Sequence, residues 1–380
     1  ASTETVGEVL LGSGTSTLDN SPGGGGGTSK LTGERLTPLS GGNLNCTGTL
    51  GTPNDQLRFT ISPALTNGIL PYAMVNGTDF ATYDTNGVTA FTNYYQGIID
   101  NAASTDNVKV TVNDLVTIPN KIINSLLIQG AAVTVSGNAG VKLTLTSGGL
   151  LTSGAAVSVT VPTLKLGAAE AQLLVSSGTT TISSVLQGSA FSKQGSGTLA
   201  LSGSNEFTGA VTVVAGILRL QSASALGASG GGATVASGAA LELDQAAGMS
   251  ITGETLSLIG TGIVALSPAG VLRNLNGNNT WSGDLTLTGN ATLGVDNGLE
   301  TLTLSGAISG AFGITKIGAG DLALSNGNCS YSGGTTVSAG KLKLNGASVI
   351  PDISAVTLSA GTTLESINLD QLLGSLSGSG

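Results

Sequence analysis

Two stretches of the chain are near copies of one another: KQGSGTLALSGSNEFTGAVTVVAGILRL at residues 193–220 and KIGAGDLALSNGNCSYSGGTTVSAGKLKL at residues 316–344. Lys193 and Lys316 open the two copies 123 positions apart (316 − 193), and one inserted residue lengthens the second copy. Such self-similarity is the signature of a repeat architecture, in which each unit buries its apolar face against the next. The repeat-defining structural positions are Gly197, Asn205, Phe207 and Gly216 in the first copy and Gly320, Asn328, Tyr331 and Gly340 in the second.

From about residue 108 onward the chain is a succession of short segments in which Leu, Val or Ile alternate with Thr, Ser, Lys or Glu. Examples are VKLTLTSGG at residues 141–149 and DLTLTG at residues 284–289. A period of two residues predicts β-strands, and the glycines between them suit sharp turns. No long helical pattern interrupts the strands; even LGAAEAQLLV at residues 166–175 is interpreted as strand and turn. We expect an all-β, right-handed parallel β-helix with coils of roughly 20–25 residues, about 17 coils in all.

Composition excludes several classes of function. The 380 residues carry a net charge of −9 with only 13 Lys and Arg, which argues against nucleic-acid partners. Histidine, the usual general base and metal ligand, is absent. No apolar run approaches the roughly 18 residues of a membrane-spanning helix. Cys46 and Cys329 lie far apart, so we expect two separate buried thiols rather than a disulfide.

Three regions are predicted. Residues 1–66 are read as β-helix coils with a Gly-rich loop at residues 23–27, and residues 67–107 as an aromatic-rich insertion or flap on the side of the rod. Residues 108–380 are read as continuous β-helix. Because the closing phrase LGSLSGSG echoes an earlier phrase after which the pattern carries on, we also expect a segment of a much longer polypeptide.

The aromatic-rich insertion is the predicted contact surface, because aromatic residues are rare elsewhere in the chain. A private mini-core remains the competing interpretation. The residues of this predicted surface are Tyr72, Asp79, Phe80, Tyr83, Tyr94 and Tyr95.

Other chemical groups receive structural interpretations. Carboxylates at Glu242, Asp244, Glu365 and Asp370 are the nearest approach to a hydrolytic pair, but the sequence places no basic residue beside them and we expect solvated outward positions. Trp281 occupies the same motif phase as Phe207 and Tyr331, which predicts an aromatic that packs in the coil interior. Asparagines near turns are predicted to form amide ladders between coils: Asn205, Asn276, Asn278, Asn279 and Asn328. No calcium-binding GGxGxD repeat is present, and we expect no cofactor and no metal.

The pattern KxGxGxLxLSxxNxxxG followed by TTVxAGxLxL, best seen at residues 316–344, resembles the autotransporter-associated β-strand repeat, also called the passenger-associated transport repeat. The chain departs from the usual NTYTGG of that family in both copies, with Glu206 and Phe207 in one and an inserted Cys329 in the other. The resemblance implies a parallel β-helix in a secreted or surface-displayed bacterial protein. It transfers no active site.

These observations favour a structural extracellular stalk or fibre segment that supports display, adhesion or filament assembly. Its expected partners are like molecules or neighbouring segments of the same chain. The alternative is an adhesin module that binds extracellular polysaccharide or a surface partner through exposed aromatics. A polysaccharide-acting enzyme ranks third, and we expect the chain not to be an enzyme.

Overall fold

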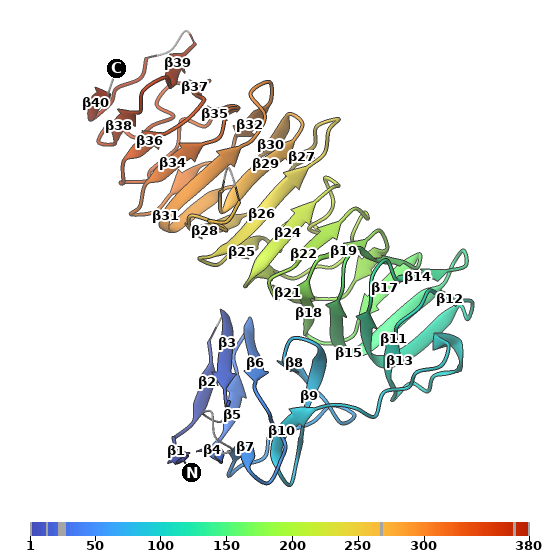
Figure 1. Cartoon of the computed structure of the whole chain (residues 1–380). Coiled ribbons are helices and arrows are strands. Elements are labelled where there is room, and N and C mark those ends of the chain that lie inside the picture. Colours follow the sequence, from blue (N-terminus) through green and yellow to red (C-terminus); the bar gives the residue numbers. More distant parts are fainter. Residues whose placement is uncertain (1, 13, 22–27, 267–268, 368–369, 379–380) are drawn as a thin grey trace. The chain divides into compact units, whose positions relative to one another are not determined.

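The computed structural model describes residues 2–12, 14–21, 28–266, 269–367 and 370–378. Within these residues the protein is all-β, and a single 3-10 turn, η1 (Ile99–Asn101), is the only helical element. The described strands form about 16 parallel coils, close to the number expected, and the predicted β-solenoid is confirmed (Figure 1). The predicted Gly-rich loop at residues 23–27 lies outside the described residues.

The chain divides into two compact units, residues 1–199 and residues 200–380. Each unit has its own buried apolar interior. The finer boundaries expected near residues 66 and 107 stay predictions.

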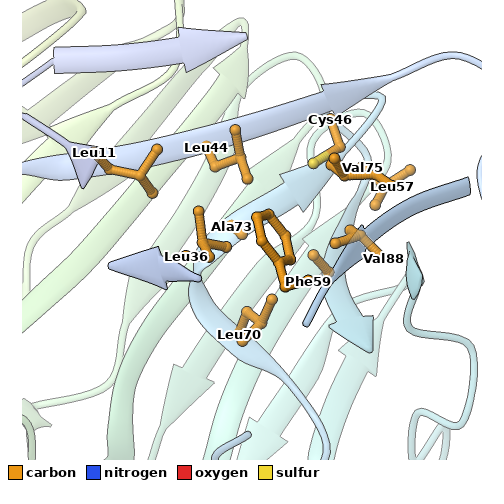
Figure 2. Packing of buried hydrophobic residues seen from close by; sticks show 11 residues of the cluster. Leu11, Leu36, Leu44, Cys46, Leu57, Phe59, Leu70, Ala73, Val75 and Val88 are labelled. Carbon is orange, nitrogen blue, oxygen red and sulfur yellow. The ribbon is translucent and has the colours of Figure 1, made fainter. Parts of the chain in front are cut away.

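The first unit begins with three coils that contribute strands to three small sheets. One sheet is parallel and contains β1 (Ser2–Thr5), β4 (Ser29–Gly33) and β7 (Asp55–Phe59). A second contains β2 (Val9–Leu11) and β5 (Leu36–Pro38), and the third contains β3 (Gly14–Asp19), β6 (Gly42–Thr47) and β8 (Leu70–Val75). Side chains of these coils, together with Val88 from residues 87–90, form a buried apolar cluster (Figure 2) that includes Leu11, Leu36, Leu44, Cys46, Leu57, Phe59, Leu70, Ala73, Val75 and Val88.

After β8 the chain leaves the parallel pattern. Strand β9 (Asp79–Asp84) folds back antiparallel to β8, and β10 (Gly87–Ala90) pairs antiparallel with β9. Asn76 adopts a positive φ of 53° and Gly87 one of 97° at the two turns. These conformations suit the Asn-Gly and Gly positions at which the sequence places them.

Parallel coils resume after η1 and fill the rest of the first unit. Leu126 pairs with Leu150 and Leu150 with Leu173, so one apolar column runs from coil to coil. The segment at residues 166–175 is strand and turn, as predicted. The strands are β11 (Asn107–Val110), β12 (Asp114–Val116), β13 (Asn120–Gln129), β14 (Thr134–Gly137), β15 (Lys142–Ser153), β16 (Val157–Thr160), β17 (Thr163–Leu166), β18 (Glu170–Ser177), β19 (Thr179–Ile182), β20 (Val185–Gln187) and β21 (Ala190–Gln194), and β22 (Thr198–Leu201) spans the boundary between the units.

The second unit repeats this arrangement, and its paired strands are parallel. Leu302 pairs with Leu322 and Leu322 with Leu342, so these successive coils are equal in length. Its strands are β23 (Val211–Val213), β24 (Gly216–Leu220), β25 (Ala233–Val235), β26 (Ala239–Asp244), β27 (Ser250–Ile251), β28 (Leu256–Gly260), β29 (Leu272–Asn276), β30 (Asn279–Trp281), β31 (Leu285–Val295), β32 (Thr301–Leu304), β33 (Ile308–Ser309), β34 (Ile314–Ile317), β35 (Asp321–Leu324), β36 (Thr335–Val337), β37 (Lys341–Leu344), β38 (Ala355–Leu358), β39 (Thr363–Ser366) and β40 (Ser375–Gly378).

The aromatic positions of the repeat point inward. Phe207, Trp281 and Tyr331 are at most 1% exposed, which confirms the predicted interior packing. The Trp281 Nε1 donates to the Glu254 carbonyl at 3.0 Å. The Tyr331 hydroxyl lies 2.7 Å from Thr335 Oγ1. The indole N–H of Trp281 and the hydroxyl of Tyr331 therefore each have a hydrogen-bond partner, as the polar groups of buried aromatic side chains usually do.

The asparagines near turns bind mainly backbone groups. Asn205 Nδ2 donates to the Ala225 carbonyl at 2.7 Å, and Asn279 Oδ1 accepts from the Met249 amide at 2.8 Å. A coil-to-coil contact between amides occurs elsewhere, where Asn124 Nδ2 donates to Asn107 Oδ1 at 2.7 Å. The predicted type of contact therefore exists at residues that the sequence analysis missed.

The lysines that open the two repeat copies are buried. Lys193 and Lys316 are 0% exposed. Lys316 Nζ donates to the carbonyls of Ile317 at 3.1 Å, Gly318 at 2.7 Å and Ala339 at 3.0 Å. Lys193 Nζ donates to two carbonyls of its own turn at 3.1 and 2.9 Å. An inward ammonium group thus satisfies turn carbonyls that a solenoid interior would otherwise leave unpaired.

Gly340 closes tightly over this ammonium group. Its φ is +68°, and a Cβ there would lie 2.5 Å from the Gly320 carbonyl oxygen and 2.7 Å from Lys316 Nζ. We expect Gly340→Ala to lower the free energy of unfolding by about 2 kcal/mol or more, because backbone strain and a steric clash add. Gly361→Ala is the matched control: its φ is +76°, but nothing lies within 4 Å of the added Cβ. Urea unfolding of both variants measures the difference, and equal losses would contradict the proposed crowding.

The buried lysines make stability depend on pH. Burial lowers the pKa of Lys193 to about 7 and that of Lys316 to about 8, from 10.5. Above the folded pKa the unfolded chain binds more protons than the folded chain, so the lysines' contribution to stability rises with pH between about 7 and 10.5. We expect Lys193→Met with Lys316→Met to flatten this rise in urea unfolding measured across that range. Parallel curves for the variant and the natural chain would refute the assignment.

Candidate binding surface

The predicted aromatic surface is in large part a buried mini-core. Phe80 is 0% exposed and Tyr94 8% exposed, and both pack with Leu127, Leu151 and Leu174 from β13, β15 and β18. The Phe80 amide donates to the Tyr94 hydroxyl at 2.9 Å. Burial raises the pKa of Tyr94. These two rings anchor the antiparallel segment to the solenoid and are closed to a ligand.

Asp79 lies beside this mini-core. Its carboxylate is 3.5 Å from Lys109 Nζ, and the same ammonium group stands 5.5 Å from the centre of the Tyr94 ring. The pair joins β9 to β11. Partly exposed ion pairs of this kind contribute little to stability, so the contact mainly orients the segment.

Tyr72 and Tyr95 are half-buried and take part in different contacts. Tyr72 lines a small polar pocket of ≈ 360 Å³ together with Glu170 and Gln172. Burial raises the pKa of Tyr72 to about 12. The Tyr95 backbone pairs in parallel with Val108 and so begins the next coil. The structure therefore does not gather the six predicted residues into one exposed face.

Tyr83 lines an open hollow of ≈ 830 Å³ on the first three coils. Its hydroxyl donates to the Phe59 carbonyl at 2.9 Å and accepts from the Phe59 amide at 2.7 Å. The ring centres of Tyr83 and Phe59 are 6.3 Å apart. We call this hollow the Tyr83 pocket; its chemically informative lining residues are Lys30, Gln56, Arg58, Phe59, Tyr83 and Asp84.

The sequence analysis identified Tyr83 but missed the other residues of the Tyr83 pocket. They come from strands in successive coils, and Lys30 pairs with Gln56 across β4 and β7. The sequence pattern that could have identified these lining residues is a set of short alternating strands with basic residues at outward positions. The separation of Lys30 and Gln56 along the chain conceals their contact unless the length of that coil is known.

Of the four carboxylates considered for a hydrolytic pair, Glu242 occupies a different environment from the one predicted. Glu242 is 0% exposed, so the expectation of a solvated position without a basic partner is wrong for this residue. Arg219 Nη2 and Arg273 Nη1 each lie 2.8 Å from it, one on either side. Arg273 also binds Asp296 at 2.5 Å. The register explains the ladder, because Arg219, Glu242 and Arg273 pair in successive coils.

The other three acids are engaged or exposed. Asp244 accepts from Gln221 Nε2 at 2.9 Å and from Asn276 Nδ2 at 3.1 Å. Glu365 pairs with Lys341 at 2.7 Å near the surface, and Asp370 is exposed. The partners of Asp244 and Glu365 hold these carboxylates in contacts between successive coils.

The buried ladder of Arg219, Glu242 and Arg273 should contribute more to the free energy of unfolding than the surface pair of Lys341 and Glu365. We expect Arg273→Met to lower the free energy of unfolding by about 3 kcal/mol, because it leaves Glu242 buried with one arginine only. Lys341→Met, which breaks the half-exposed pair with Glu365, should change the free energy of unfolding far less, because solvent screens an exposed ion pair. Urea unfolding of the two variants provides the comparison. A cost for Arg273→Met no larger than that of its control would rule out the ladder as a stabilising element.

Three further observations limit the chemistry. Among the described residues, no group of three or more Cys, Asp or Glu side chains is placed to hold a metal ion. The same residues contain no helix that is long and apolar enough to cross a membrane. Cys46 and Cys329 are separate free thiols, as predicted, but only Cys46 is buried, whereas Cys329 is half-buried. Burial raises the pKa of Cys46 to about 12, which makes it a poor nucleophile.

Comparison with known proteins shows which repeat family and which relative the chain resembles. The passenger-associated-transport-repeat family matches at residues 191–220 and 314–344. The chain is 42% identical over 110 residues to the adhesin BmaC autotransporter of Brucella suis biovar 1 (strain 1330). This stretch covers 29% of the chain and 3% of that relative. No solved structure matches at a significant level.

The matched residues include the buried Lys193 and Lys316, the positive-φ Gly216 and Gly340, and the inward Phe207 and Tyr331. The matched repeat family and the matched relative both support an extracellular or cell-surface location for the chain. The chain is therefore a surface β-solenoid that carries two copies of the passenger-associated transport repeat.

Proposed function

We propose that this chain is a structural stalk or fibre segment of a surface passenger, which supports display, adhesion or filament assembly. The observation that carries the proposal is the stacking within each unit, where inward residues recur at the same position in successive coils. Leu322, for example, is flanked in its column by Leu302 and Leu342. Such stacking distributes load over many backbone hydrogen bonds and nearest-neighbour contacts.

A mechanical role also fits the ion pairs that the buried charged side chains form with one another. The strongest candidate acid, Glu242, binds arginine through both of its carboxylate oxygens. A general acid or base needs an accessible oxygen within reach of a substrate. We therefore propose that the segment is not an enzyme and that its partners are like molecules or neighbouring parts of the same passenger.

Adhesion is the second candidate function. The observation that favours it is the open Tyr83 pocket, which lies outside the repeat and combines aromatic, basic and amide groups. The matched relative is named an adhesin, which supports the same idea. The two functions are compatible, because the pocket uses outward residues and the stalk uses inward ones.

Removal of one whole coil tests the structural role. Deletion of residues 302–321 removes a single coil and joins Thr301 to Leu322, so the parallel register can re-form. In a bacterium that displays the parent passenger, we expect the shortened protein to remain folded and displayed, because a solenoid is stabilised by contacts between neighbouring coils. Surface labelling and resistance to added protease are the readouts.

A half-coil deletion of residues 302–312, an odd number of residues, is the matched control. It should abolish protease-resistant display, because it places outward residues in inward columns. If both deletions are displayed equally well, register does not matter and the stalk proposal fails. If neither is displayed, the segment has a role that depends on this particular coil rather than on stacking, which also contradicts the proposal.

A further inference from the structure

The Tyr83 pocket has a floor set by the parallel register of the first three coils. Thr3 pairs with Lys30 and Lys30 with Gln56, so these three side chains form a row across β1, β4 and β7. Arg58 lies two residues beyond Gln56 and shares its face, since alternate residues of a strand point the same way. The Thr3 hydroxyl, the Lys30 ammonium, the Gln56 amide and the Arg58 guanidinium therefore lie on one face of the parallel sheet.

One wall is a fixed aromatic ring. Both hydrogen bonds of the Tyr83 hydroxyl go to the Phe59 backbone, at 2.7 and 2.9 Å, which holds the ring without the help of a ligand. Tyr83 is half-buried and lines the pocket. A preformed ring of this kind offers apolar contact area at little entropic cost on binding.

The charge of the pocket is opposite to that of the protein. Lys30 and Arg58 line it, and neither forms an ion pair with any residue that the structure describes. Asp84 is the one acid in the lining, and it accepts a hydrogen bond from the Asn86 amide within its own turn. Two basic groups against one acid make the pocket locally positive in a chain of net charge −9.

Gln56 supplies a polar group that a ligand in the pocket can bind. The side chain is 7% exposed, yet within the described structure its only hydrogen bond is a long one from Nε2 to Asn86 Oδ1 at 3.4 Å. The amide oxygen is not one of the buried polar atoms left without a partner, and it is open to solvent at the pocket floor. A hydroxyl group of a ligand can donate to it.

We propose that the Tyr83 pocket binds a carboxylate-bearing sugar unit of an acidic polysaccharide. The Arg58 guanidinium and Lys30 ammonium bind the carboxylate, Gln56 and the neighbouring threonines bind sugar hydroxyls, and the Tyr83 ring packs against the sugar. A pocket of ≈ 830 Å³ accommodates a few such units. The inference deepens the adhesive candidate function and rests on it.

The test uses the purified chain and a hexamer of galacturonic acid, measured by isothermal titration calorimetry. The methyl-esterified hexamer is the matched probe, because it keeps the sugar and removes the charge. We expect the acid form to bind and esterification to weaken binding by about tenfold or more. Arg58→Gln and Lys30→Gln should each produce a similar loss, and their unfolding curves should match that of the natural chain because both positions lie at the surface.

Lys165→Gln is the control variant, since Lys165 is exposed on β17 and does not line the pocket. It should leave binding unchanged. Equal binding of the two hexamers, binding of neither, or an equal loss in Lys165→Gln would overturn the proposal. The coil deletion at residues 302–321 leaves the pocket residues intact, so failure of this test and failure of the stalk proposal are distinguishable.

Discussion

Parallel pairing between successive coils is the constraint on which the rest of the structure depends. Once a strand pairs with its equivalent in the next coil, every inward side chain lies directly above another inward side chain. The column of Leu302, Leu322 and Leu342 follows from this rule, and so does the burial of Trp281 and Tyr331 in their own coils. A one-residue slip would turn each apolar column outward, so register and core are a single property of the fold.

The same constraint forces polar residues to find partners above and below them. Glu242 is tolerable in the interior only because the register brings Arg219 and Arg273 to its two sides. Lys316 reaches turn carbonyls of its own coil and of the next, which the solenoid cannot otherwise pair. Buried charge in this protein is therefore accommodated by the stacking of successive coils.

The sequence predicted the features that depend on local period, and it missed those that depend on coil length. Alternating strands, inward aromatics and separate thiols follow from residue type and spacing alone. The environment of Glu242 does not, because the coil that joins Leu241 to its partner Leu272 is much longer than the coil that joins Leu302 to Leu322. Coils of unequal length hide which residues meet. The Tyr83 pocket was missed for the same reason, since it joins three coils to a residue of the antiparallel segment.

Outward residues escape this constraint, which explains where a binding function can reside. A change at an inward position disturbs two neighbouring coils, whereas Arg58 and Lys30 can vary without altering any column. The antiparallel strands β9 and β10 add a wall that a regular coil lacks, and Tyr83 fixes that wall to the sheet through Phe59. Specific recognition on a solenoid therefore depends on a departure from the repeat. The repeat itself provides the rigid floor against which such a departure can form a pocket.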